Sequence, residues 1–139
     1  MCTNGLALAR RAPHLNYRPG LVGFPSEGLT LEDLDEVGTS HQLSVVRATL
    51  RLVDEELGVR DYVAHVVPRF VAAVPCNSML LVELRLTCTF EALVNASSFA
   101  PDGDEQVLVF AENANEALAL YASEMTFGER YLLEALAAR

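Results

Sequence analysis

The sequence has no lysine and no tryptophan, so its ten strongly basic residues are all arginines. Nineteen acidic residues outweigh them and give the 139-residue chain a net charge of −9. DNA and RNA binding depends on a cationic stripe that neutralises phosphates, and this sequence contains no such stripe. The charge balance therefore argues against a nucleic-acid partner. The use of arginine alone is typical of a GC-rich genome.

Cysteine is also scarce, and the spacing of the cysteines matches no known motif. Cys2, Cys76 and Cys88 form an odd set without a Cys-x-x-Cys or Cys/His motif. This pattern predicts neither a disulfide framework nor a zinc site. We therefore expect no metal and no cofactor, and a reducing cytoplasm as the compartment.

The sequence lacks a hydrophobic run of the roughly 18 to 20 residues that cross a bilayer. The first 19 residues carry Arg10, Arg11 and Arg18 around a short apolar "GLALA", too short for a secretory signal. We expect residues 1–19 to form a flexible N-terminal arm and residues 20–139 to form one domain. No association with a membrane is expected.

A helical pattern covers residues 39–57. Its apolar residues recur at alternating spacings of three and four: Leu43, Val46, Leu50, Val53 and Leu57. Thr39 or Ser40 is suited to cap the start, and Gly58 to end the helix in a left-handed conformation. Because further apolar residues widen this stripe, we expect a mostly buried helix.

The pattern then changes to the two-residue period of strands. We expect strands at residues 62–71, 78–90, 105–113 and 117–127, followed by a short terminal helix at 128–139. Pro68 predicts an edge strand or a bulge. Met79 and Leu81 fall on the outward face of their strand, which suggests a covered surface between subunits. The sequence thus predicts an α+β domain with a long helix against an antiparallel sheet.

Two segments carry a resemblance to a known family. Asp33-Leu34-Asp35-Glu36-Val37-Gly38 is similar to the Asp-x-Asp-x-x-Gly loop of the 4-hydroxybenzoyl-CoA thioesterase family, and "PRFVAAVPCNSMLLVELRL" resembles that family's second and third strands. The resemblance covers about residues 20–127. It implies a hotdog fold, in which a sheet wraps a central helix, and a homodimer or dimer of dimers. It also implies hydrolysis of an acyl-CoA or acyl-carrier-protein thioester.

The resemblance assigns the catalytic carboxylate to Asp35, as nucleophile or general base, while Asp33 would hold the loop. His41 is a second catalytic candidate, although the family places its histidine two positions earlier. Free N–H groups at the helix start would stabilise the oxyanion. The candidate substrate-binding residues are Gly38, Thr39, Gln42 and, for a substrate phosphate, Arg69. Clustering of Glu32, Asp33, Asp35 and Glu36 is expected to raise at least one pKa.

Other interpretations remain open. In one alternative, the domain is a non-hydrolytic hotdog protein that binds an acyl group or acts as a dehydratase or cyclase in lipid or polyketide biosynthesis. Alternatively, it is a partner-binding α+β domain whose acidic loop contacts a basic surface. Acidic residues ahead of a helix also stabilise its dipole without any catalytic role. The sequence leaves open the acyl chain and the choice between CoA and carrier protein.

Overall fold

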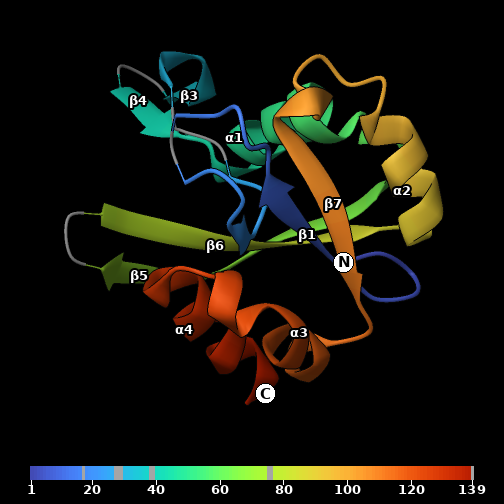
Figure 1. Cartoon of the computed structure of the whole chain (residues 1–139). Helices are drawn as coiled ribbons and strands as arrows, with labels where there is room; N and C mark the ends of the chain where they lie inside the picture. Colours follow the sequence, from blue (N-terminus) through green and yellow to red (C-terminus); the bar gives the residue numbers. More distant parts are fainter. Residues whose placement is uncertain (17, 27–29, 38–39, 75–76, 139) are drawn as a thin grey trace.

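Four α-helices and three antiparallel sheets make up the described part of this α+β fold (Figure 1). The computed structural model describes residues 1–16, 18–26, 30–37, 40–74 and 77–138. The strands are β1 Leu6–Arg11, β2 Val22–Gly23, β3 Leu34–Val37, β4 Ser40–Leu43, β5 Val63–Val74, β6 Asn77–Leu86 and β7 Gln106–Ala111. The α-helices are α1 Val45–Leu52, α2 Phe90–Ser97, α3 Ala114–Tyr121 and α4 Phe127–Ala137. Short helical turns are η1 Leu31–Asp33, η2 Val53–Leu57, η3 Arg60–Tyr62, η4 Gly103–Glu105 and η5 Ala122–Glu124.

The first sheet has the order β2-β1-β7, with β1 in the middle. All six residues of β1 pair with β7, from Leu6 opposite Ala111 to Arg11 opposite Gln106. Leu8 is 1% exposed, so the strand also contributes to the core. The predicted flexible arm is therefore wrong for residues 6–11, because a distant strand supplies their hydrogen-bond partners. The predicted strand at 105–113 is confirmed by β7.

The long β5–β6 hairpin crosses the molecule between the β3–β4 hairpin and helices α3 and α4 (Figure 1). Its register shifts between Pro68 and Phe70, which confirms the expected irregularity at the proline. Leu81 is buried and packs in a cluster with Leu132 of α4. The prediction that Leu81 lies on an exposed outer face is therefore wrong. Leu81 no longer supports a surface that is covered by a second subunit.

The predicted helix at 39–57 starts later than expected. Residues 40–43 form β4, which pairs with β3, and α1 begins after Ser44, whose hydroxyl accepts the Arg47 N–H at 3.3 Å. The helix continues through η2, a π-helical turn, and ends at Gly58 with φ 62°, as expected. None of the α1 residues is buried, and only Val53 and Leu57 of η2 enter the core. The expectation of a mostly buried helix is wrong for α1.

Residues 117–124 form helical structure where a strand was expected at 117–127. Asn113 caps α3 by accepting the Glu116 N–H at 3.1 Å, and the following Ala- and Leu-rich segment favours a helix. The terminal helix is confirmed as α4, which Thr126 and Glu129 cap reciprocally. The two helices pack on the first sheet through a core of Leu6, Leu8, Val22, Ala111, Ala117 and Leu133.

A hotdog fold with a long central helix is not confirmed. The strands within the described ranges lie in three separate sheets, and none of these sheets wraps around α1. A second apolar core instead joins η2, β6 and α2 through Val53, Leu57, Leu86 and Leu93. Among the described residues, no helix has both the length and the apolar character needed to cross a membrane.

Candidate functional site

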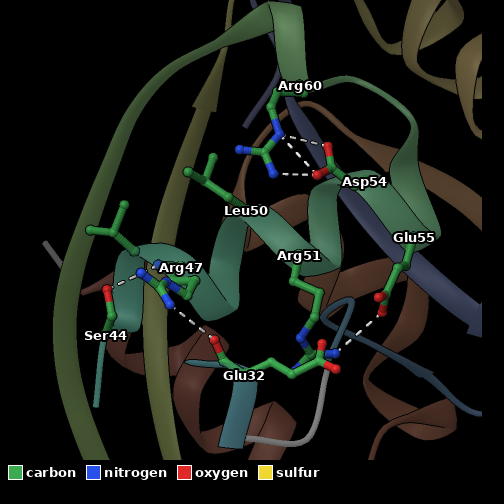
Figure 2. A pocket seen from close by; sticks show the side chains of 9 residues that line it. Glu32, Ser44, Arg47, Leu50, Arg51, Asp54, Glu55 and Arg60 are labelled. Carbon is green, nitrogen blue, oxygen red and sulfur yellow. Dashed lines mark hydrogen bonds and ion pairs between the residues drawn. The ribbon is translucent and has the colours of Figure 1, made fainter. Parts of the chain in front are cut away.

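An open cleft of about 500 Å³ lies along the exposed side of α1 (Figure 2). Its lining residues come from η1, the whole length of α1 with its cap, and the turns η2 and η3: Glu32, Ser44, Val46, Arg47, Leu50, Arg51, Asp54, Glu55 and Arg60. Val46 and Leu50 supply apolar surface, while the other side chains are polar or charged. The cleft therefore offers contacts to a ligand that has both an apolar and a polar part.

Asp33 lies behind the cleft and is fully buried. Arg51 donates two hydrogen bonds to it, Nε to Oδ1 at 3.2 Å and Nη2 to Oδ2 at 3.0 Å, and the Thr30 N–H donates a third at 2.8 Å. These bonds, with that of Arg51 the largest influence, hold the pKa of Asp33 below its ordinary value. The rise in pKa expected from crowded carboxylates is therefore wrong for Asp33.

The backbone of Asp33 also fixes the start of α1. Its carbonyl oxygen accepts the Ser44 N–H at 2.8 Å, so η1 and the helix start are joined at one residue. Arg51 additionally pairs with Glu55, one helical turn further along the chain, at 3.2 Å. The role expected for Asp33, holding the acidic loop in place, agrees with these contacts.

Asp35 is more accessible than Asp33, since its side chain is 43% exposed. It lies in β3, and its Oδ1 pairs with Arg47 Nη2 at 2.6 Å. Arg47 also donates to the carbonyl oxygens of Glu32 at 3.3 Å and Leu34 at 3.0 Å. Asp35 is not among the residues that line the cleft, and its connection to the cleft is the ion pair with Arg47, which does line it.

The β3–β4 register separates the two strongest catalytic candidates. Asp35 is opposite Gln42, while His41 is opposite Glu36. Neighbouring residues of a strand point to opposite faces, so His41 lies on the other face from Asp35 and Gln42. His41 and Gln42 are both exposed. The structure therefore brings Gln42, and not His41, to the side of Asp35.

The expected oxyanion donors also change. Gly38 and Thr39 lie outside the described residues, and Gln42 belongs to β4 rather than to a first helical turn. Because α1 begins at Val45, the N–H groups of Val45 and Val46 are the ones without an acceptor inside the helix. These groups lie at the same end of the cleft as Ser44.

Arg69 lies on β5 and is not among the residues that line the cleft. It pairs with the largely buried Glu83, which also pairs with Arg85. Burial, the largest influence, raises the pKa of Glu83, but the bonds from Arg85 and Arg69 reverse this effect and leave the pKa lowered. The structure thus places Arg69 in a separate ion-pair cluster on the hairpin.

Each arginine that lines the cleft is paired with a carboxylate. Arg47 binds Asp35, Arg51 binds Asp33 and Glu55, and Arg60 binds Asp54 with its Nε 2.7 Å and 2.9 Å from the two carboxylate oxygens. Figure 2 shows the Arg60 and Arg51 side chains directed at Asp54 and Glu55. These pairs occupy the guanidinium groups that a phosphate would bind. Among these pairs, only Arg51–Glu55 has the four-residue spacing that brings two side chains together on one helix.

No protein-family model matches the chain, and no curated protein matches it. The likeness to the thioesterase family therefore depends on residues 33–38 and 68–86 alone. Within the described ranges, no three His, Cys, Asp or Glu side chains are grouped so that they could hold a metal ion.

Proposed function

We propose that the protein hydrolyses an acyl thioester in the cleft beside α1, with Asp35 as the catalytic carboxylate. The observation that carries this proposal is that Asp35 is accessible and forms an ion pair with Arg47, a residue that lines the cleft. The buried Asp33 beside it supplies the fixed backbone that a catalytic loop needs. The reaction class comes from the sequence resemblance around residues 33–38.

The proposed reaction uses water as the second substrate. Asp35 takes a proton from the water, the water oxygen bonds to the acyl carbon, and the carbon–sulfur bond breaks. The leaving sulfur receives the proton, so the products are a carboxylic acid and a free thiol. The N–H groups of Val45 and Val46 would stabilise the negative carbonyl oxygen. Val46 and Leu50 would contact the apolar part of the acyl chain.

The proposal extends to the finer assignments of fold and assembly. We infer a distant relation to hotdog thioesterases, which act as homodimers or dimers of dimers, and we place the reaction in the cytoplasm. The relation is supported by the sequence motif Asp33 to Gly38, which precedes the segment that contains α1. Sedimentation at micromolar concentration tests the assembly, because the dimer predicts twice the chain mass of 15.2 kDa.

A specific contact favours a second candidate, a non-hydrolytic protein that binds acyl thioesters. The ion pair with Arg47 engages Asp35 Oδ1, so this oxygen is already bonded and less available to hold a water molecule. In this alternative, the cleft binds the acyl group and the Asp35–Arg47 pair only shapes its wall. A third candidate, binding of a partner protein, draws support from three exposed apolar residues near the cleft: Leu31, Leu43 and Val46.

Release of free thiol from a panel of acyl-CoA and acyl-pantetheine thioesters tests hydrolysis directly. We expect turnover by the wild type and a loss of at least about 100-fold in Asp35→Asn, which keeps the shape but removes the base. Asp54→Asn is the matched control, since Asp54 is an equally exposed cleft carboxylate paired with an arginine. It should retain turnover.

The same panel separates the candidates. Binding of a thioester without release of thiol would favour the acyl-binding protein. Absence of both binding and turnover, together with salt-sensitive binding of a basic protein, would favour the partner-binding domain. Equal turnover by the wild type and Asp35→Asn would rule out the proposed role of Asp35.

A further inference from the structure

The first three residues of the chain lie along the end of β6. The Leu86 N–H donates to the Met1 carbonyl oxygen at 2.9 Å, and the Thr3 N–H donates to the Cys88 carbonyl oxygen at 3.0 Å. The Thr3 hydroxyl donates to the same Cys88 oxygen at 3.3 Å. These bonds place Cys2 beside Cys88, although 85 residues separate them in the sequence.

The two cysteine side chains meet inside the second apolar core. Cys2 is 8% and Cys88 is 6% exposed, and both belong to the cluster formed by η2, β6 and α2. Both cysteines are present as free thiols. A disulfide needs its two sulfur atoms close together on side chains that point toward each other. The backbone bonds on both sides of Cys2 and the shared buried cluster bring the two side chains together in the folded chain.

We propose that Cys2 and Cys88 are a disulfide-forming pair, which links the start of the chain covalently to the end of β6 under oxidising conditions. A low-molecular-weight disulfide serves as the oxidant. One cysteine thiolate attacks it and forms a mixed disulfide, and the second cysteine then displaces the remaining thiol. In total, the pair loses two hydrogen atoms and the oxidant is reduced to two thiols. The link joins the segment that leads into β1 to the β5–β6 hairpin.

The surroundings of the pair set the conditions for this reaction. Burial is the largest influence on Cys2 and raises its pKa to about 11, and burial also raises the pKa of Cys88. Thiolate is therefore scarce at neutral pH, and exchange should be slow there and faster as the pH rises. A pair of this kind responds to sustained oxidation rather than to a brief pulse.

The test uses the full chain with Cys76→Ser, so that only the two cysteines of the pair remain. The folded protein is treated with oxidised glutathione at mildly alkaline pH and then quenched with an alkylating reagent. We expect loss of both thiols, a mass decrease of two hydrogen atoms and a Cys2–Cys88 cross-linked peptide after digestion. The melting temperature should rise by at least about 5 °C, because the bond closes a long loop, and dithiothreitol should reverse the shift.

Two single variants in the same background serve as controls. Cys2→Ser and Cys88→Ser should each form no internal link and show no rise in melting temperature. The proposal is overturned if the folded parent keeps both thiols, if glutathione adducts form without a cross-link, or if the cross-link appears only in denaturant. All three outcomes are read from the parent protein, so they do not depend on the folding of the serine variants.

Discussion

The two ends of the molecule are stabilised in different ways. At one end, α1 contributes no buried residue, and the β3–β4 hairpin is tied to it by charged contacts around Asp33 and Asp35 (Figure 1). At the other end, α4 buries Gly128, Leu132 and Leu133 against sheet residues. At the charged end, polar side chains line a solvent-accessible cleft, where they can contact a ligand. The apolar end is stabilised by burial of α4 leucines in two clusters.

The largest effect should come from the apolar end. Leu133 is fully buried, so Leu133→Ala should reduce the free energy of unfolding by about 2–5 kcal/mol, the usual range for a core leucine. Val46→Ala is the counterpart at the charged end, where the side chain is 47% exposed, and it should cost less than about 0.5 kcal/mol. Urea denaturation measures both values. Similar losses in the two variants would contradict the contrast between the ends.

A smaller effect is expected from the buried ion pair. Asp33→Asn keeps the size of the side chain but removes the charge that Arg51 binds, so the protein should lose stability at neutral pH. Because the pKa of Asp33 is lowered in the folded state, its stabilisation is complete above the unfolded value of about 3.9. It is lost as the pH falls through the lower folded value.

The difference in unfolding free energy between the wild type and Asp33→Asn should therefore be constant at neutral pH. It should shrink once the pH drops below about 4. Denaturation curves collected across this range measure the difference. A difference that grows on acidification would show that folding raises the pKa of Asp33 instead of lowering it.

The smallest effect belongs to an exposed ion pair at the apolar end. Arg130 and Glu134 pair at 2.9 Å one turn apart on α4, and both side chains are about half exposed. Glu134→Gln should cost only about 0.3–0.5 kcal/mol, and the loss should disappear at high salt. A loss as large as that of Asp33→Asn would mean that burial does not distinguish the two ion pairs.

Local sequence patterns predicted the elements that have a clear two-residue period or a run of strong helix formers. The strands at 62–71 and 105–113 and the terminal helix are present, and Gly58 ends its helix as expected. Residues 6–11 were missed because their pairing strand, β7, follows much later in the chain. Residues 117–127 were misassigned because alternating Ala and Leu fit a strand, whereas helix propensity and the Asn113 cap decide for a helix.

The site was predictable only in part. The sequence identified Asp33 and Asp35 as a pair and anticipated that Asp33 would hold the loop, but it could not distinguish their burial. Leu43 continues the helical spacing, yet it pairs with Leu34 in a hairpin and moves the helix start to Ser44. This shift changes the expected oxyanion donors and puts His41 on the face opposite Asp35. Both changes result from the pairing of β3 with β4, which the spacing of apolar residues does not reveal.

The most direct test of the account is a paired measurement on the two aspartates. Thioester turnover and unfolding free energy are measured side by side for Asp33→Asn and Asp35→Asn. We predict that Asp35→Asn loses at least about 100-fold in turnover with a stability change below about 1 kcal/mol, since its ion pair is exposed. Asp33→Asn should lose more stability and less turnover. Full turnover in Asp35→Asn, or a larger loss of turnover in Asp33→Asn, would contradict the account.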